Sequence, residues 1–181
     1  MALAGFSGAQ DGRIEGYACL FETVDLGRDV VARGAFSASL AARGAAGVRL
    51  LYQHDPAEPI GVWTHLAEDG RGLYVRGRLL LDVTRGREVM SLVRDGALDG
   101  LSIGFKAVQA RTDPRSRVRR LLRIDLWEVS IVTFPMQPDA RIAPAFSALV
   151  PSPSPTSRTP HDPAFRSPRD QGDRAGRRLA P

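Results

Sequence analysis

The stretch LSIGF, residues 101–105, decides the expected fold class because its apolar residues occupy alternate positions. Such alternation is typical of a β-strand that packs one face against a core. Ser102 is then expected on the opposite face, and Gly104 leaves space there for another backbone or a substrate. The stretch therefore predicts a strand that presents a hydroxyl group opposite its packed face.

A second alternating stretch, WEVSI at residues 127–131, places Glu128 and Ser130 on one face and its apolar residues, Trp127 included, on the other. A carboxylate within an apolar strand needs a partner, because an unpaired buried charge costs much free energy. The partner is either an imidazole that the carboxylate orients or an arginine such as Arg120 or Arg123.

His54 follows an apolar run at residues 48–54 and precedes Asp55 and Pro56, so it is expected at a strand end where the chain turns. A histidine there could accept the proton of a serine hydroxyl, because its ordinary pKa lies near neutrality. Taken alone, His54 also fits a turn residue bonded to nearby backbone.

Other interpretations remain open at this point. Ser102 alone fits a serine that faces water on an edge strand. Asp125 and Asp55 rival Glu128 as the carboxylate, and His65 is expected to be structural or exposed.

The rest of the domain reads mainly as strand. Further strands are expected at residues 14–22, 48–54, 61–66, 73–81, 118–126 and 127–134, beside one at 101–108. The turn sequence EDGRG at residues 68–72 favours a hairpin and an antiparallel sheet. Helices are expected at residues 35–43 and 84–94, the second ended by Asp95 and Gly96.

With 181 residues and 43% apolar content, the chain is large enough for one domain with a core. We expect a loose start at residues 1–12, a folded domain at 13–143 and a disordered tail, rich in Pro, Ser and Arg, at 144–181. No signal peptide or apolar run of about 20 residues is evident, so a soluble protein that remains where it is made is expected.

The net charge of +5 and the pI near 10.3 raise nucleic acid as a partner. Lys106 is the only lysine among 25 basic residues, which indicates GC-rich coding, and much of the excess charge lies in the tail. A nucleic-acid-binding barrel also needs aromatic residues among basic ones, and only Tyr74 suggests this. Specific nucleic-acid binding is therefore not favoured.

Cys19 is the only cysteine, which excludes an intrachain disulfide and fits a reducing cytoplasm. It could pair with His54 as a nucleophile, but its apolar neighbours indicate a buried, inert thiol. The three histidines show no metal-ligand spacing.

Taken together, these segments resemble the prohead protease family of tailed phages, from residue 16 to about residue 142. The resemblance rests on GAF at 34–36, LYQHD at 51–55, PIG at 59–61, GLYV at 72–75, GALDGLSIGF at 96–105 and LWEVSIVT at 126–133. The family is similar in fold to the herpesvirus assembly protease. It therefore implies a β-barrel of about seven strands with a few helices.

The resemblance also implies a serine endopeptidase that needs no metal or cofactor. The histidine of the family's His-Asp motif falls on His54, its serine nucleophile on Ser102, and its Glu-Val-Ser motif puts the third member on Glu128. The herpesvirus enzymes use a second histidine instead, and this sequence has none there. The sequence FPMQP at 134–138 departs from the family's small residues, so the oxyanion hole stays unassigned.

As substrates, the resemblance implies the major capsid protein and its scaffold segment, processed inside the procapsid in the cytoplasm of a bacterial host. The source is a phage, a prophage or a phage-derived gene-transfer particle. Self-cleavage and a homo-oligomer are compatible with it, and neither a membrane nor a specific nucleic acid is implied. The alternative is a non-catalytic capsid-assembly or scaffolding factor with the same fold.

Overall fold

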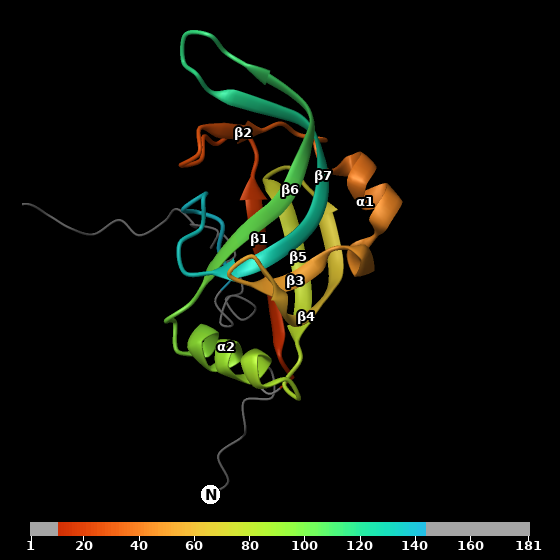
Figure 1. Cartoon of the computed structure of the whole chain (residues 1–181), viewed down its shortest axis with the longest axis vertical. Helices are drawn as coiled ribbons and strands as arrows, with labels where there is room; N and C mark the ends of the chain where they lie inside the picture. The colour runs from red at the N-terminus through yellow and green to blue at the C-terminus, as the bar shows by residue number, and fades with distance from the viewer. Residues whose placement is uncertain (1–10, 144–181) are drawn as a thin grey trace, which may run out of the picture. The chain divides into compact units, whose positions relative to one another are not determined.

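The computed structural model describes residues 11–143, and within them a seven-stranded sheet carries two α-helices and a short 3₁₀ turn (Figure 1). The strands are β1 (Arg13–Leu20), β2 (Asp29–Val31), β3 (Arg49–Tyr52), β4 (Asp55–Glu68), β5 (Gly72–Leu79), β6 (Gly100–Thr112) and β7 (Arg119–Val132). The helices are α1 (Ser37–Arg43) and α2 (Thr84–Arg94), and the 3₁₀ turn is Ala45–Gly47. The expected seven-stranded, mainly β architecture is confirmed.

The sheet is mixed, so the expectation of an antiparallel sheet is only partly correct. Its strand order is β1-β5-β4-β3-β7-β2, with β6 paired to the other side of β7. The hairpin of β4 and β5 is antiparallel as expected, but β2 and β3 both run parallel to β7. Turn signals report only pairs of strands that are neighbours in sequence, whereas these parallel pairs join distant segments.

Strand β7 replaces the two strands expected at 118–126 and 127–134. Gly104 of β6 pairs with Glu128, but the next residue, Phe105, pairs with Leu126, which leaves Trp127 as an extra residue. Such a bulge reverses the alternation of faces. Trp127 is therefore 52% exposed and does not lie on the packed face, contrary to expectation.

A short segment at residues 140–143 connects the two sides of the curled sheet. Tyr17 of β1 donates its N–H to the carbonyl of Arg141, and Leu101 of β6 donates to the carbonyl of Ala140 (3.2 and 2.9 Å). The sheet thereby approaches a closed barrel. The core inside it includes Leu50, Ile60, Val75, Leu79, Leu101, Leu126 and Ile131. Each such side chain contributes about 1.5–3 kcal/mol on burial.

The two ends of the domain differ in construction. Helix α2, whose bounds agree with those expected, lies at one end, and the hairpin that joins β6 to β7 projects at the other (Figure 1). No helix within residues 11–143 is both long and apolar enough to cross a membrane. The expected tail at 144–181, and the expected loose start except for residues 11 and 12, lie outside the described residues.

Candidate active site

The sequence-predicted site residues come together on β7, between β3 and β6. Ser130 of β7 pairs with Leu51 of the parallel strand β3 and with Ser102 of the antiparallel strand β6. Two residues earlier on β7, Glu128 pairs with Gly104 of β6. Directly opposite residues of an antiparallel pair share a face, with Cβ atoms about 5 Å apart. Ser102, Glu128 and Ser130 therefore project on one side of the sheet.

His54 reaches this face from the tight turn between β3 and β4. Gln53 and His54 both have positive φ (54° and 61°), a conformation that is uncommon in residues other than glycine and often occurs at functional sites. The turn is fixed to the end of β7, because Gln53 N donates to the carbonyl of Ile131 (3.0 Å) and Gln53 Nε2 donates to Thr133 Oγ1 (2.7 Å).

Glu128 joins the histidine to the sheet. Its Oε1 lies 2.6 Å from His54 Nδ1, and its Oε2 accepts a hydrogen bond of 2.6 Å from Ser130 Oγ. Ser130 Oγ in turn accepts the backbone N–H of His54 (3.2 Å). Because a carboxylate can only accept, a neutral His54 donates from Nδ1 and leaves Nε2 as a free acceptor. The three residues form a closed ring of hydrogen bonds.

The same contact changes the proton affinity of the imidazole. The hydrogen bond that His54 donates to Glu128, reinforced by the negative charge of the carboxylate, raises the pKa of His54 above its ordinary value, whereas partial burial acts to lower it. The Glu128 side chain is only 12% exposed, so little water screens the interaction. Such a carboxylate stabilises the protonated ring.

Ser102 lies on the same face but makes no hydrogen bond to another side chain within residues 11–143. It is 5% exposed, so the interpretation of a serine facing water is wrong. No hydrogen bond joins Ser102 to His54 in this structure. In unliganded enzymes, hydrogen bonds between catalytic groups are often long and tighten only when substrate binds.

Gly104 has a different role from the one expected. A Cβ atom at this position would collide with Glu128 Oε1 and lie 2.6 Å from Glu128 Cδ. The space above Gly104 is therefore filled by the Glu128 side chain, and neither a second backbone nor a substrate could enter it. Glycine lets the carboxylate lie flat across β6 and reach His54.

The rival carboxylates are engaged elsewhere. Asp125 accepts two hydrogen bonds from Arg43 (2.9 and 3.0 Å), and Asp55 Oδ1 accepts the N–H of Ala57 (2.8 Å) within its own turn. Arg120, expected as an alternative partner of Glu128, instead forms an ion pair with Glu22 (2.6 Å).

Cys19 and His65 take no part in this cluster. Cys19 is buried as expected, and burial raises the pKa of its thiol to about 12. His65 is exposed as expected and contacts Tyr74 edge-on, with 6.2 Å between ring centroids.

Sequence reasoning missed the contribution of Ser130. The alternation in WEVSI placed it beside Glu128 but gave no reason to assign it a role. Its position is fully buried, and a buried hydroxyl needs a hydrogen-bond partner. That burial is the signal that distinguishes Ser130, and it appears only once β3 and β6 are paired on both sides of β7.

The sequence of this chain is similar to those of known proteins. The sequence pattern of the family described as Caudovirus prohead serine protease matches residues 5–151. The chain is 35% identical over 139 residues to the prohead protease of Enterobacteria phage HK97, covering 74% of this chain and 60% of that protein. It is 32% identical over 101 residues to a capsid polyprotein of Pseudomonas phage PAJU2, covering 52% of this chain and 15% of the polyprotein. The chain thus spans less than two thirds of the length of these relatives.

The solved structures that are similar to this chain include the following two. The bacteriophage T4 capsid assembly protease gp21 aligns with a TM-score of 0.56 and 17% identity, over 66% of this chain and 80% of that one. A KSHV protease in complex with a hexapeptide phosphonate inhibitor aligns with a TM-score of 0.46 and 12% identity, over 72% of this chain and 63% of that one. At this identity the T4 structure supports the fold alone.

Proposed function

The chain belongs to the Caudovirus prohead serine protease family, and on that premise we propose that it is a serine endopeptidase that processes capsid or scaffold proteins during prohead maturation. Its nucleophile is Ser102, its general base is His54, and Glu128 is the third member. The observation that carries this assignment is the 2.6 Å contact between Glu128 and His54 Nδ1, on the face of the sheet from which Ser102 projects.

The mechanism is acyl transfer. His54 Nε2 removes the proton of Ser102 while Oγ attacks the carbonyl carbon of the scissile peptide bond, and Glu128 stabilises the imidazolium that forms. The imidazolium then protonates the leaving amine, and water hydrolyses the acyl-enzyme with His54 again acting as the base. Ser130 holds the second oxygen of Glu128, so that the carboxylate keeps its orientation through both steps.

The substrate class follows from relatives. A segment similar to this chain occurs within a protein named capsid polyprotein, which supports a capsid protein, with its scaffold segment, as the substrate. Cleavage then takes place inside the assembling procapsid in the host cytoplasm, and self-cleavage of the protease is compatible with it.

Co-expression of the chain with the major capsid and scaffold proteins of its particle, followed by mass spectrometry of the protein termini, tests the proposal. New termini are expected with the wild-type chain and with Ser116→Ala, a control on the exposed β6–β7 turn, but not with Ser102→Ala. Unprocessed capsid protein with all three, beside normal particle assembly, would instead favour the non-catalytic assembly factor. Processing that persists in a well-folded Ser102→Ala protein would overturn the nucleophile assignment.

A further inference from the structure

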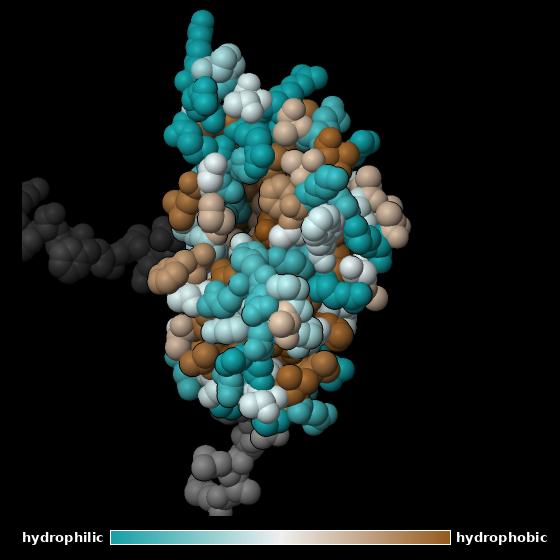
Figure 2. Space-filling model, viewed as in Figure 1, coloured by the Kyte–Doolittle hydropathy of each residue, from teal (hydrophilic) through white to brown (hydrophobic). Residues whose placement is uncertain are grey.

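The ribbon that β6 and β7 form at residues 106–123 carries unpaired positive charge. Within the described part of the chain, only two of its seven basic residues, Arg119 and Arg120, form ion pairs, with Asp29 and Glu22. The other five are exposed: Lys106, Arg111, Arg115, Arg117 and Arg123. In Figure 2 the projecting end of the ribbon, at the top of the view, shows mainly hydrophilic residues. The proposed catalytic groups use none of them.

Three of the unpaired residues lie on the face of the ribbon that also carries the candidate active site. The opposite face packs on the core through three buried residues of β7: Leu121, Ile124 and Leu126. The residues next to these on β7 point away from the core, and Arg123 is one of them. Arg111 shares their face because it pairs with Arg120, and Lys106 shares it because it pairs with Asp125. We call Lys106, Arg111 and Arg123 the basic face.

The basic face begins close to the active centre and continues away from it along β6. Gly104, which pairs with Glu128, marks the active centre on this strand. At about 3.3 Å per residue, Lys106 lies roughly 7 Å and Arg111 roughly 23 Å from Gly104 along the strand. A polypeptide that crosses the active centre in an extended conformation therefore reaches the basic face with residues well outside the segment that is cleaved.

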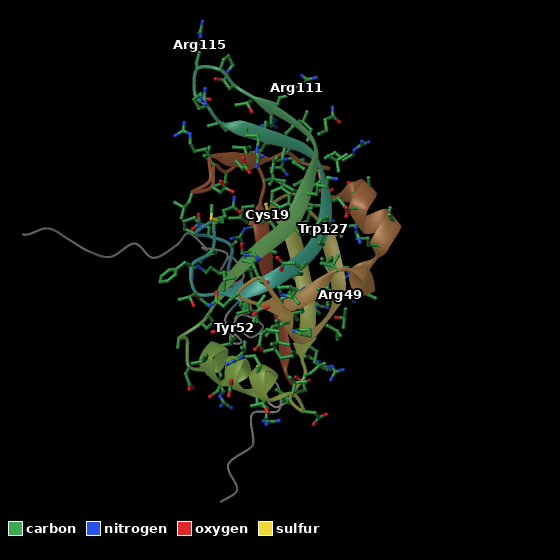
Figure 3. The ribbon with its side chains drawn as sticks, viewed as in Figure 1. Cys19, Arg49, Tyr52, Arg111, Arg115 and Trp127 are labelled. Atoms are coloured by element: carbon green, nitrogen blue, oxygen red, sulfur yellow. The ribbon has the colours of Figure 1, made fainter. Side chains whose placement is uncertain are left out.

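Hydrogen bonds order the turn at the end of the ribbon. Asp113 Oδ1 accepts the N–H groups of Arg115 and Ser116 (2.9 and 2.6 Å). Asp113 N donates to the carbonyl of Val118 (2.9 Å), and the Arg28 side chain donates to the carbonyl of Ser116. Figure 3 shows Arg115 at the tip of the hairpin, pointing away from the rest of the ribbon. The basic side chains thus project from a defined backbone, which needs little ordering when a partner binds.

The chemistry of this surface fits an acidic polypeptide better than a nucleic acid. Single-stranded nucleic acid is bound through aromatic side chains on which bases stack, and residues 106–123 contain none. Carboxylates also interrupt the positive charge, since Asp125 lies opposite Lys106 and Glu22 is bound to Arg120. A continuous row of phosphates would meet these negative charges. A polypeptide avoids them, because its acidic side chains are needed only opposite the unpaired basic residues.

We propose that the basic face, with Arg115 and Arg117 of the turn, is a docking surface for an acidic segment of the protein substrate, separate from the segment that is cleaved. This inference rests on the proposed function. Guanidinium groups bind carboxylates through two parallel hydrogen bonds, which favours arginine for this purpose. Docking at a distance raises the effective concentration of the cleavage site at the active centre without any part in the chemistry.

Binding of labelled peptides to the full-length Ser102→Ala chain, measured by fluorescence anisotropy, tests the surface without cleavage. The probe is a peptide of about twelve residues that alternates glutamate and serine, long enough to span the ribbon. Its matched control has glutamine in place of glutamate. We expect the glutamate peptide to bind at least about tenfold more tightly at low salt. This preference should disappear near about 1 M salt, where charges are screened within about 3 Å.

Substitutions on the ribbon locate the binding. Arg111→Glu and Arg123→Glu should each raise the Kd of the glutamate peptide about fivefold or more. The fold should be retained, since Arg111→Glu removes a pair of like charges opposite Arg120, and thermal unfolding checks this. Arg78→Glu is the matched control, because Arg78 is an exposed residue of β5 without an ion pair among residues 11–143. It changes the net charge equally and should alter the Kd by no more than about twofold.

Cleavage by the chain with Ser102 intact connects the surface to the substrate. Arg111→Glu and Arg123→Glu should slow cleavage of the purified capsid and scaffold proteins about fivefold or more. They should leave unchanged the kcat/KM of a short peptide that spans a cleavage site mapped in the co-expression experiment, because such a peptide does not reach the ribbon. Arg78→Glu should change neither rate.

The outcomes separate the two proposals. Equal binding of the two peptides, equal effects of Arg111→Glu and Arg78→Glu, or tighter binding of a single-stranded DNA of equal charge overturns the docking surface, and Ser102-dependent cleavage then leaves the protease intact. Unchanged cleavage of the substrate proteins by the ribbon variants overturns it as well. Absence of any Ser102-dependent cleavage overturns the proposed function, and with it the assignment of the acidic segment to a substrate.

Discussion

The two halves of β7 belong to one continuous strand but differ in what surrounds them. The inner half, residues 124–132, is paired with β3 on one side and β6 on the other, and there Glu128 and Ser130 form a hydrogen-bonded cluster with His54. The outer half, residues 119–123, pairs with short β2 and with the projecting part of β6. Glu128 and Ser130 are enclosed in the inner half, whereas the arginines of the outer half are exposed.

The outer half and its hairpin are strongly basic. Residues 111–123 contain six arginines and one acidic residue. Arg111 lies directly opposite Arg120 on the paired strand, a destabilising arrangement of like charges that the ion pair of Arg120 with Glu22 offsets. Figure 3 labels Arg111 and Arg115 on this hairpin. Exposed ion pairs contribute up to about 1 kcal/mol each. The comparison predicts that the inner half tolerates few substitutions and the outer half many.

The largest effect is expected from Glu128→Gln. The amide keeps the shape of the side chain but removes the charge that stabilises imidazolium, so kcat should fall on the order of 10⁴-fold. Asp125→Asn, one bulge away on the same strand, should cost about tenfold or less. Peptide-cleavage rates decide between them, and an inactive Asp125→Asn beside an active Glu128→Gln would move the role to Asp125.

The pH dependence of cleavage gives a second, smaller effect. Because Glu128 raises the pKa of His54, the imidazole becomes protonated at a higher pH than an ordinary histidine does as the pH falls. Protonated His54 cannot act as the base, so kcat/KM should fall about tenfold per pH unit below that pKa. In the pH profile of the residual activity of Glu128→Gln, the fall of kcat/KM on the acid side should occur at lower pH. The free energy of unfolding depends on pH in the opposite direction. Protonated His54, bonded to Glu128, stabilises the folded protein at pH values below the ordinary pKa of histidine, and this stabilisation is lost as the pH rises through the raised pKa. Identical acidic limbs in the two proteins would contradict the contact.

Gly104→Ala tests the packing of the inner half. The added methyl group meets the Glu128 carboxylate, so either the carboxylate leaves His54 or the strands shift, at a cost of about 1–3 kcal/mol. Thermal unfolding and kcat should both decline. Gly70→Ala is the matched control, because a Cβ there meets no atom within 4 Å. Equal stability of the two variants would show that β6 and β7 are not tightly packed at Glu128.

The smallest effect is expected in the hairpin. Arg111→Ala and Arg115→Ala remove exposed side chains that form no ion pair within residues 11–143, so the free energy of unfolding should change by no more than about 0.5 kcal/mol. Cleavage of short peptides should be unchanged. A large loss of stability in either variant would show that the outer half is as tightly coupled as the inner half.

Local signals predicted much of the fold. Helix α2 and the turn at residues 68–72 were expected within their observed bounds, because a capped periodic run and a glycine-rich turn act over neighbouring residues. The parallel pairing of β3 with β7, strand β2 and the bulge at Trp127 were not expected. They depend on which distant strands meet, and the alternation of side chains contains no information about that.

The candidate site likewise combines features that local sequence patterns predict with features that depend on contacts between distant strands. The face shared by Glu128 and Ser130 could be predicted from alternation, and the meeting of Glu128 with His54 was one of two alternatives that the sequence left open. The ring completed by Ser130 and the clearance provided by Gly104 could not be predicted. Both arise from contacts across three strands that come together only in the folded sheet.

Mapping of a fluorophosphonate label by tandem mass spectrometry tests the central claim most directly. Ser102 Oγ should attack the phosphorus and displace fluoride, so the account predicts a single modified residue, Ser102, labelled far more slowly in His54→Ala. A label on Ser130 or another serine, or a folded chain that is not labelled at all, would contradict it.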